Sequence, residues 1–166
     1  MAHGPARRPA AVLPLLALAV LAGCTAAGER TQAAGERAQT CVSWVGFDTP
    51  AEAVDDATVV VRTDRPAPVV RTVDLFGVDA RVHAVTVAEV LKGHDIRVGD
   101  EVEVASTPVT CTGDEIYPEG DPLDATGPLI VLLHQDASNV WRTITPGQGV
   151  VPATVDGQVP GAWPSG

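Results

Sequence analysis

Lysine is almost absent from this chain of 166 residues: Lys92 is the only one, and 11 basic side chains face 21 acidic ones for a net charge of -10. Proteins with a general affinity for nucleic acid hold its phosphates with clustered lysine and arginine. The charge balance excludes that affinity, and we expect no nucleic-acid partner.

Aromatic residues are also scarce, at 4% of the chain, although 45% of the residues are hydrophobic. An apolar content this high excludes a chain that is disordered throughout. The 16 glycines and 14 prolines indicate many turns and short elements rather than long helices. The composition therefore favours an all-β domain with a small helix added.

The apolar stretch Ala10–Ala22 is too short for a membrane-spanning helix, which needs about 20 apolar residues, and it contains Pro14. Arg7 and Arg8 precede it and supply a positive start. A positive start followed by a short apolar stretch ending in small residues is typical of an export signal. We interpret residues 1–23 as a signal peptide that is removed.

The predicted signal ends in Leu21-Ala22-Gly23-Cys24, which resembles the lipobox of bacterial lipoproteins. In that family the cysteine thiol is diacylated, with chains such as palmitate, and the signal is cut just before the cysteine. The resemblance implies that acyl chains on Cys24 attach the protein stably to the extracytoplasmic face of the cell membrane. The alternative is an ordinary secretory signal cut near Ala22 or Ala27, which would leave Cys24 as a free thiol.

Removal of residues 1–23 takes away Arg7 and Arg8 but no acid, so the net charge of the remaining chain becomes -12. Anionic lipid headgroups repel so acidic a domain, and no basic patch is expected to draw it to the membrane. The acyl chains on Cys24 are therefore expected to do the anchoring alone.

Residues 24–40 are predicted to be the lipidated cysteine and a flexible tether, because they contain no large apolar side chain. The sequence Ala-Ala-Gly-Glu-Arg occurs twice, at Ala26–Arg30 and Ala33–Arg37, which is too little for a repeat fold. A flexible chain of this length spans about 20–25 Å. A short helix is the alternative, weakened by Gly28 and Gly35.

Three cysteines are present. With Cys24 assigned to the anchor, Cys41 and Cys111 remain, and in an oxidising compartment they most simply form a disulfide. The loop it closes is long, so the chain-entropy model gives about 4 kcal/mol of stabilisation. A redox role is not indicated, since the two cysteines are not arranged as C-x-x-C.

We expect one domain over residues 41–158 and a loose tail over 159–166, whose Trp163 could dock on the domain. Thr49-Pro50-Ala51-Glu52 has the form of a capping box and predicts a short helix to about Asp56. The segment 66–79, with its prolines, is expected to be a loop or an irregular hairpin connection. Runs or alternations of β-branched residues predict strands over 58–63, 81–91 with a bulge near Ala88 or Glu89, 96–104, 129–133, 140–144 and 150–155.

Five or six short strands separated by long loops are typical of a small Greek-key, partly open barrel, and an OB-like fold is our first choice. An immunoglobulin-like sandwich is the alternative. It would need seven evenly spaced strands with an intervening core tryptophan, and the sequence does not show them.

The run 82–93, which ends in Val90-Leu91-Lys92-Gly93, is followed by Val98-Gly99-Asp100 and a strand to residue 104. This arrangement resembles the strand-turn-strand core of small exported bacterial proteins with netrin- or TIMP-like OB barrels. Residues 147–157 resemble the close of many uncharacterised lipoproteins of this kind. Metalloprotease inhibitors of this fold present a free N-terminal cysteine amine to the protease metal. In this chain the corresponding Cys24 is expected to be lipidated on a tether, which argues against inhibition by that mechanism.

No catalytic motif is visible in the sequence. It has no G-x-S-x-G and no H-E-x-x-H, and His83, His94 and His134 are isolated from one another. An enzyme would need His83 and His134 to converge on a carboxylate in space. We expect no catalysis, no cofactor and no metal site.

Two features leave alternatives open. An acidic loop could hold Ca²⁺ but has no EF-hand spacing, and a solvated loop is the simpler interpretation; its acids are Asp114, Glu115, Glu119, Asp121 and Asp124. Trp44 and Trp141 either pack in the core or form a binding face.

Taken together, these features indicate a lipid-anchored extracytoplasmic protein of the bacterial cell envelope that binds or scaffolds a partner. The alternative is a protease-inhibitor-like or cation-binding regulator of the envelope.

Overall fold

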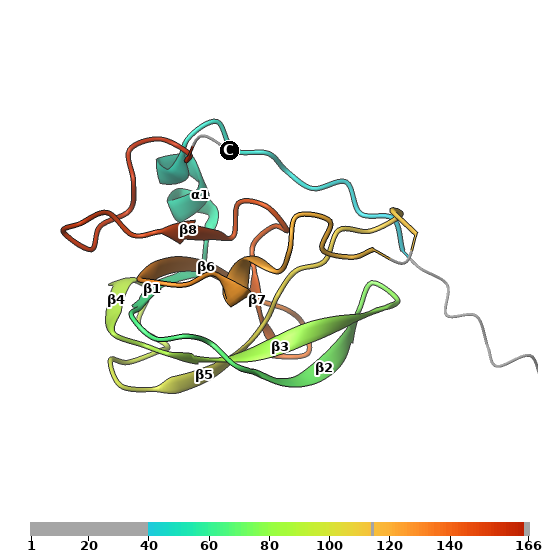
Figure 1. Ribbon diagram of the computed structural model, residues 1–166, viewed down its shortest axis with the longest axis horizontal. Helices are drawn as coiled ribbons and strands as arrows, with labels where there is room; N and C mark the ends of the chain where they lie inside the picture. Colours follow the sequence, from blue (N-terminus) through green and yellow to red (C-terminus); the bar gives the residue numbers. More distant parts are fainter. Residues whose placement is uncertain (1–39, 114, 165–166) are drawn as a thin grey trace, which may run out of the picture. The chain divides into compact units, whose positions relative to one another are not determined.

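The computed structural model describes residues 40–113 and 115–164 (Figure 1). The predicted signal 1–23, Cys24, the tether up to residue 39 and Asp114 lie outside the described residues. The described elements, in chain order, are α1 (Pro50–Asp56), β1 (Val59–Thr63), β2 (Val69–Leu75), β3 (Val78–Thr86), β4 (Glu89–Lys92), β5 (Glu101–Ala105), the 3-10 helix η1 (Pro122–Asp124), β6 (Leu129–Gln135), β7 (Trp141–Thr143) and β8 (Val150–Pro152). None of the helices in these ranges has the length and apolar character that crossing a membrane requires.

The strands form one mixed sheet in the order β2-β3-β5-β7-β6-β1-β4, with β8 added on β6. The β5·β7 pair is parallel and the other pairs are antiparallel. The sheet does not close. The expectation of an all-β domain with a small helix is confirmed (Figure 1).

Helix α1 begins as the capping box predicts. The Thr49 hydroxyl accepts a hydrogen bond from Glu52 N at 3.3 Å, and Pro50 occupies the first helical position. The Glu52 carboxylate accepts from Asp48 N at 3.0 Å rather than from the capping residue itself. At the other end, Lys92 Nζ donates to the carbonyls of Val54 and Asp55, a favourable place for a cation.

Strand β6 is central, as its uninterrupted apolar sequence predicts, because both of its faces are buried. Leu129, Val131 and Leu133 pack into one apolar cluster with the β3 and β5 side chains Val85 and Val104. The alternate residues of β6 face the other way. Ile130 and Leu132 pack with Ala53 of α1, with Ala57 just after the helix and with Val151 of β8. Figure 1 shows α1 on the side of the sheet that carries β8.

The predicted long strand 81–91 is interrupted. It divides into β3 and β4 at Val87-Ala88, where the chain changes partners. Val87 N donates to Asp100 O at 2.9 Å, whereas Ala88 N donates to Arg62 O in β1 at 2.8 Å. The irregularity expected near Ala88 or Glu89 is therefore a break between two strands rather than a bulge within one. Val90 nevertheless packs against the same cluster as Val85 and Val87, as its expected parity requires.

We expected segment 66–79 to be a loop or an irregular hairpin connection, but it contains strand β2 and the start of β3, which pair as a hairpin. The two strands are joined at Phe76-Gly77, both with positive φ, 60° and 83°. Strand β2 lies at the edge of the sheet and is mostly exposed, with Val69 at 47% and Val70 at 49%. Only Leu75 at its end is buried, so most of this strand has no need of alternation and periodicity did not reveal it.

The predicted strand 96–104 is shorter than expected. Strand β5 begins at Glu101, and within it Val102 and Val104 point inward while Glu101 and Glu103 are exposed, as predicted. Ile96 is buried in the preceding turn, but Val98 is 66% exposed rather than inward-facing.

The segment after residue 158 contacts the domain at Trp163, whose indole N–H donates to Phe47 O at 2.8 Å. The side chain also packs against the apolar cluster beneath α1. The docked position that we considered for Trp163 is the one found in the structure.

Candidate functional site

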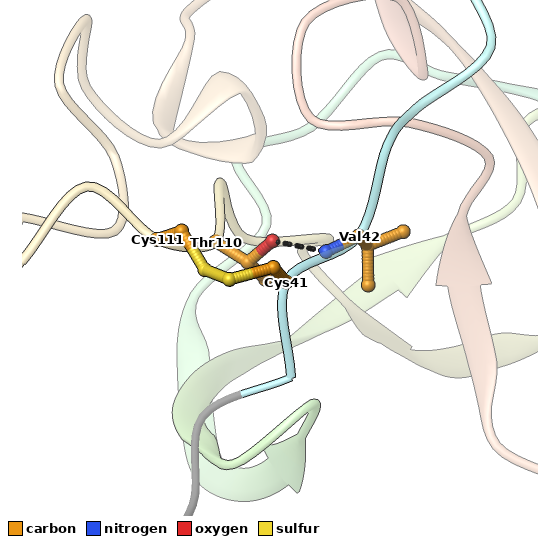
Figure 2. The surroundings of a disulfide bond; sticks show 4 residues. All are labelled: Cys41, Val42, Thr110 and Cys111. Atoms are coloured by element: carbon orange, nitrogen blue, oxygen red, sulfur yellow. Dashed lines mark hydrogen bonds between the residues drawn. A yellow bond between two sulfur atoms is a disulfide. The ribbon is translucent and has the colours of Figure 1, made fainter.

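The predicted disulfide is present. Cys41 and Cys111 are bonded, with their Cα atoms 5.4 Å apart. Figure 2 shows that Val42 N beside it donates to the Thr110 hydroxyl, at 2.8 Å. The disulfide therefore ties the segment before α1 to the long loop between β5 and η1.

The same loop is held at its other end by a buried histidine. His83 projects from β3 with its side chain fully buried. Its Nδ1 lies 2.7 Å from the carbonyl oxygen of Ala67, and its Nε2 lies 2.9 Å from Asp121 Oδ2. The Asp121 side chain is also fully buried.

Asp121 is satisfied at both of its oxygens. Oδ2 meets His83, and Oδ1 accepts from Ser106 Oγ at 2.6 Å and from Leu123 N at 3.1 Å. The bond from Leu123 N to Asp121 caps helix η1. Leu123 itself is fully buried in the core. The acid that we assigned to a solvated loop is thus an interior anchor of that loop.

The pKa values of His83 and Asp121 shift in opposite directions. Burial by itself lowers the pKa of His83, but the hydrogen bonds to Asp121 and Ala67, and the charges of Asp121 and Asp124, outweigh it and raise the pKa above its ordinary value. Burial raises the pKa of Asp121, but the bonds from His83, Ser106 and Leu123 outweigh it and lower the pKa. Each shift favours the charged form of its group.

Arg81 and Tyr117 close the network on its outer side. Arg81 Nη1 lies 3.0 Å from Asp124 Oδ2 and 3.8 Å from Asp121 Oδ2, and the guanidinium lies 5.4 Å from the centre of the Tyr117 ring. Tyr117 Oη donates to Ser106 O at 2.8 Å and accepts from Arg81 N at 3.1 Å. Burial raises the pKa of Tyr117 above its ordinary value.

A recess of about 630 Å³ lies outside this network. Volumes of this order are usual for ligand pockets, which are mainly apolar with a few polar groups. Its lining residues are Val109, Tyr117, Pro118, Glu119, Gly120, Asp121, Pro122, Asp124, Ala125, Pro146 and Gly147. A recess bordered by groups with shifted pKa values is the best candidate for a binding site in the described residues.

The two tryptophans have different surroundings. Trp44 packs edge-on against Phe76, with ring centres 5.3 Å apart, and the Arg142 guanidinium lies 5.8 Å from its ring centre. Trp141 packs against the apolar cluster of β3 and β5 and lines a second, polar recess of about 420 Å³. Arg142 and Trp141 are neighbours in β7 and point to opposite faces. The two tryptophans therefore do not join in one binding face.

The structure gives each domain histidine on a strand its own aspartate, so His83 and His134 do not share one. His134 Nε2 lies 3.0 Å from Asp56 Oδ2, and His134 Nδ1 lies 3.0 Å from the Thr58 hydroxyl. In the sequence His134 lies 76 positions from Thr58 and 78 positions from Asp56, so no spacing pattern could have revealed the cluster.

The two histidine clusters differ in what they could do chemically. In Thr58–His134–Asp56 the imidazole lies between hydroxyl and carboxylate, the order of a nucleophile, base and orienting acid. None of these three residues lines either of the two recesses. In the buried cluster Asp121 lies between Ser106 and His83, so the serine hydroxyl donates to a carboxylate rather than to an imidazole.

The acidic loop has partners of its own. Asp121 is paired with His83 and Asp124 with Arg81, while Glu115 and Glu119 are exposed. Across residues 40–113 and 115–164, no three histidine, cysteine or acidic side chains are grouped so that they could hold a metal ion.

No protein-family model matches the chain, and no curated protein and no solved structure matches it.

Proposed function

We propose that the chain is a lipid-anchored, non-catalytic binding or scaffolding protein of the bacterial cell envelope, held at the extracytoplasmic face of the membrane through Cys24. The observation that supports this most is the disulfide. It occupies Cys41 and Cys111, and the chain has three cysteines, so Cys24 alone is left for acylation. A structural disulfide also fits an oxidising compartment outside the cytoplasm.

We further propose that the domain is an OB-like barrel in which β3 and β4 act as one sharply bent strand. Only Val87-Ala88 separates them, and while β3 pairs with β5, β4 pairs with β1 at the far end of the sheet. A bent strand that pairs with both ends of a sheet brings those ends together, as in a partly open barrel.

The recess beside Tyr117 is the proposed place of binding. Most of its walls come from a loop that is fixed at one end by the disulfide and at the other by the buried His83–Asp121 pair, and Pro146 and Gly147 complete them. A loop fixed in this way presents a preformed surface, which reduces the entropy lost when a partner binds.

The anchor is tested on the protein from intact cells, comparing the wild-type chain with Cys24→Ala. We expect mass spectrometry to find an acylated N-terminal peptide that starts at Cys24, and we expect the variant to leave the membrane fraction. A variant that stays in the membrane fraction without acylation would show that the anchor is elsewhere.

The recess is tested by placing a photo-cross-linking residue at Ala125, which lines it, and at Val98 as a control. Both positions are exposed, but Val98 lies in the turn before β5 and does not line the recess. Illumination of intact cells should yield a discrete adduct from position 125 only. The same adduct from both positions would contradict a binding role of the recess.

A further inference from the structure

Both ring nitrogens of the buried His83 face hydrogen-bond acceptors. The Ala67 carbonyl can only accept a hydrogen bond, and an ionised Asp121 can only accept as well. A neutral imidazole carries one N–H and would leave one of these contacts without a hydrogen. The protonated ring satisfies both contacts, and its charge matches that of Asp121.

The attachments of the recess wall to the sheet pass through this pair. Asp121 caps η1 and accepts from Ser106, which follows β5, while Ser106 O accepts from Tyr117 in the wall itself. When His83 loses its proton, Asp121 no longer faces a positive charge, and one of the two contacts of the ring loses its hydrogen bond. A buried charge without its partner is strongly destabilising, and hydration of the loop relieves it.

The charged and titratable groups around His83 are few. From the loop, Asp121 lies at 2.9 Å, and Asp124 Oδ1 lies 4.0 Å from Nδ1. Arg81, on the same strand as His83, reaches Asp124 at 3.0 Å and Asp121 at 3.8 Å. Tyr117 interacts with Asp121, and its side chain carries no positive charge. The charges of Asp121 and Asp124 favour the charged imidazole, consistent with the raised pKa of His83.

We propose that His83 is a proton-controlled latch for the recess. While its ring is doubly protonated, residues 117–125 stay docked on the sheet and the recess is formed; when the ring loses a proton at higher pH, this segment detaches and binding at the recess is lost. The docking of the loop stands on the contacts alone, whereas its effect on binding rests on the proposed function of the recess.

The test is an NMR titration of the ¹⁵N-labelled full chain in detergent micelles, from neutral to alkaline pH. We expect the ring nitrogens of His83 to show the charged form at neutral pH. The amide signals of Gly120, Leu123 and Asp124 should then shift with the same midpoint as the ring. A neutral ring at neutral pH overturns the proposal, and so does a ring that titrates while these amides do not move.

Two variants sharpen the titration. His83→Gln keeps an amide donor for Asp121 but has no proton to lose, and it should abolish the loop transition at that midpoint. His134→Gln, in the exposed pair, should leave the transition unchanged. If His83→Gln fails to fold, the wild-type titration decides by itself, since the coincidence of ring and loop midpoints is measured there.

Cross-linking from position 125 at several pH values separates this inference from the proposed function. An adduct that falls with the His83 midpoint supports both. An adduct that is independent of pH overturns the latch and leaves the binding site in place. The absence of any adduct, together with a coincident loop transition, contradicts the binding role and leaves a latch that controls the loop only.

Discussion

Two histidine–aspartate pairs of nearly equal length lie in opposite environments. The Nε2–Oδ2 distance is 2.9 Å in His83–Asp121 and 3.0 Å in His134–Asp56. The side chains of the first pair are fully buried, whereas His134 is 28% exposed and Asp56 is 52% exposed. We therefore expect the two pairs to behave differently, because only one is exposed to water and because the second ring nitrogen of each histidine has a different partner.

That other contact decides the protonation that each site requires. His83 Nδ1 faces the carbonyl of Ala67, which only accepts, so the ring needs both hydrogens. His134 Nδ1 faces the hydroxyl of Thr58, which can donate to a neutral ring while Nε2–H donates to Asp56. A histidine–carboxylate distance alone does not show whether the histidine is charged.

Removal of the acid from each pair should give the largest contrast. Asp121→Ala leaves a buried histidine and the donors Ser106 and Leu123 without their acceptor, and we expect a loss of about 3–5 kcal/mol. The matched change Asp56→Ala should cost less than about 1 kcal/mol, because water screens the exposed pair. Denaturant unfolding of the two variants measures both values. Similar losses in the two variants would contradict the contrast.

The disulfide is the second restraint on the loop, and its removal should have the next largest effect. The double variant Cys41→Ser with Cys111→Ser should lose about 2–4 kcal/mol, since the bond closes a long loop in the unfolded chain. Cys24→Ser is the matched control and should unfold like the wild type. If the control is as unstable as the double variant, the stabilisation is wrongly assigned to this bond.

The pH dependence separates the pairs without removing a side chain. The pKa of His83 is raised, so its stabilisation is complete below the ordinary value of 6.5 and is lost as the pH rises through the folded-state value. The pKa of Asp121 is lowered, so its stabilisation is complete above 3.8 and is lost as the pH falls through the folded-state value. The contribution of the pair is therefore greatest between pH 3.8 and 6.5.

The measurement is the free energy of unfolding against pH for the wild type and His83→Gln. The difference between the two curves should be widest in that window and should narrow on its alkaline side. A difference that grows as the pH rises would mean that His83 is neutral in the folded state.

The parts of the fold that the sequence predicted correctly are those held by apolar burial. Val104 and Glu103 alternate because one face of β5 is dry, and β6 is apolar throughout because both faces are covered. Strand β2 gave no such signal, since most of its residues are exposed, and the prolines at 66 and 68 suggested a loop. Periodicity in a sequence reflects the burial of one strand face, and an edge strand buries little of its surface.

The candidate site, like the fold, was predicted only in part from the sequence. Cys41 and Cys111 were predicted as a pair by counting, because few cysteines leave few combinations. The contact between His83 and Asp121 spans 38 positions and depends on how the loop folds back over β3, which no local pattern encodes. A histidine among the β-branched residues of a strand was the visible signal. It indicated burial, and its partner became identifiable only in three dimensions.

The exposed pair should yield the smallest effect. In a double-mutant cycle of His134→Gln and Asp56→Asn, the coupling energy should be below about 1 kcal/mol and should fall as salt is added, because solvent screens both groups. The corresponding cycle of His83→Gln and Asp121→Asn should give a larger coupling with little dependence on salt, since no ions reach the pair. A strong, salt-resistant coupling in the exposed pair would mean that Thr58, His134 and Asp56 act as one rigid unit. The hydroxyl–imidazole–carboxylate order would then merit a direct assay for reactivity at the Thr58 hydroxyl.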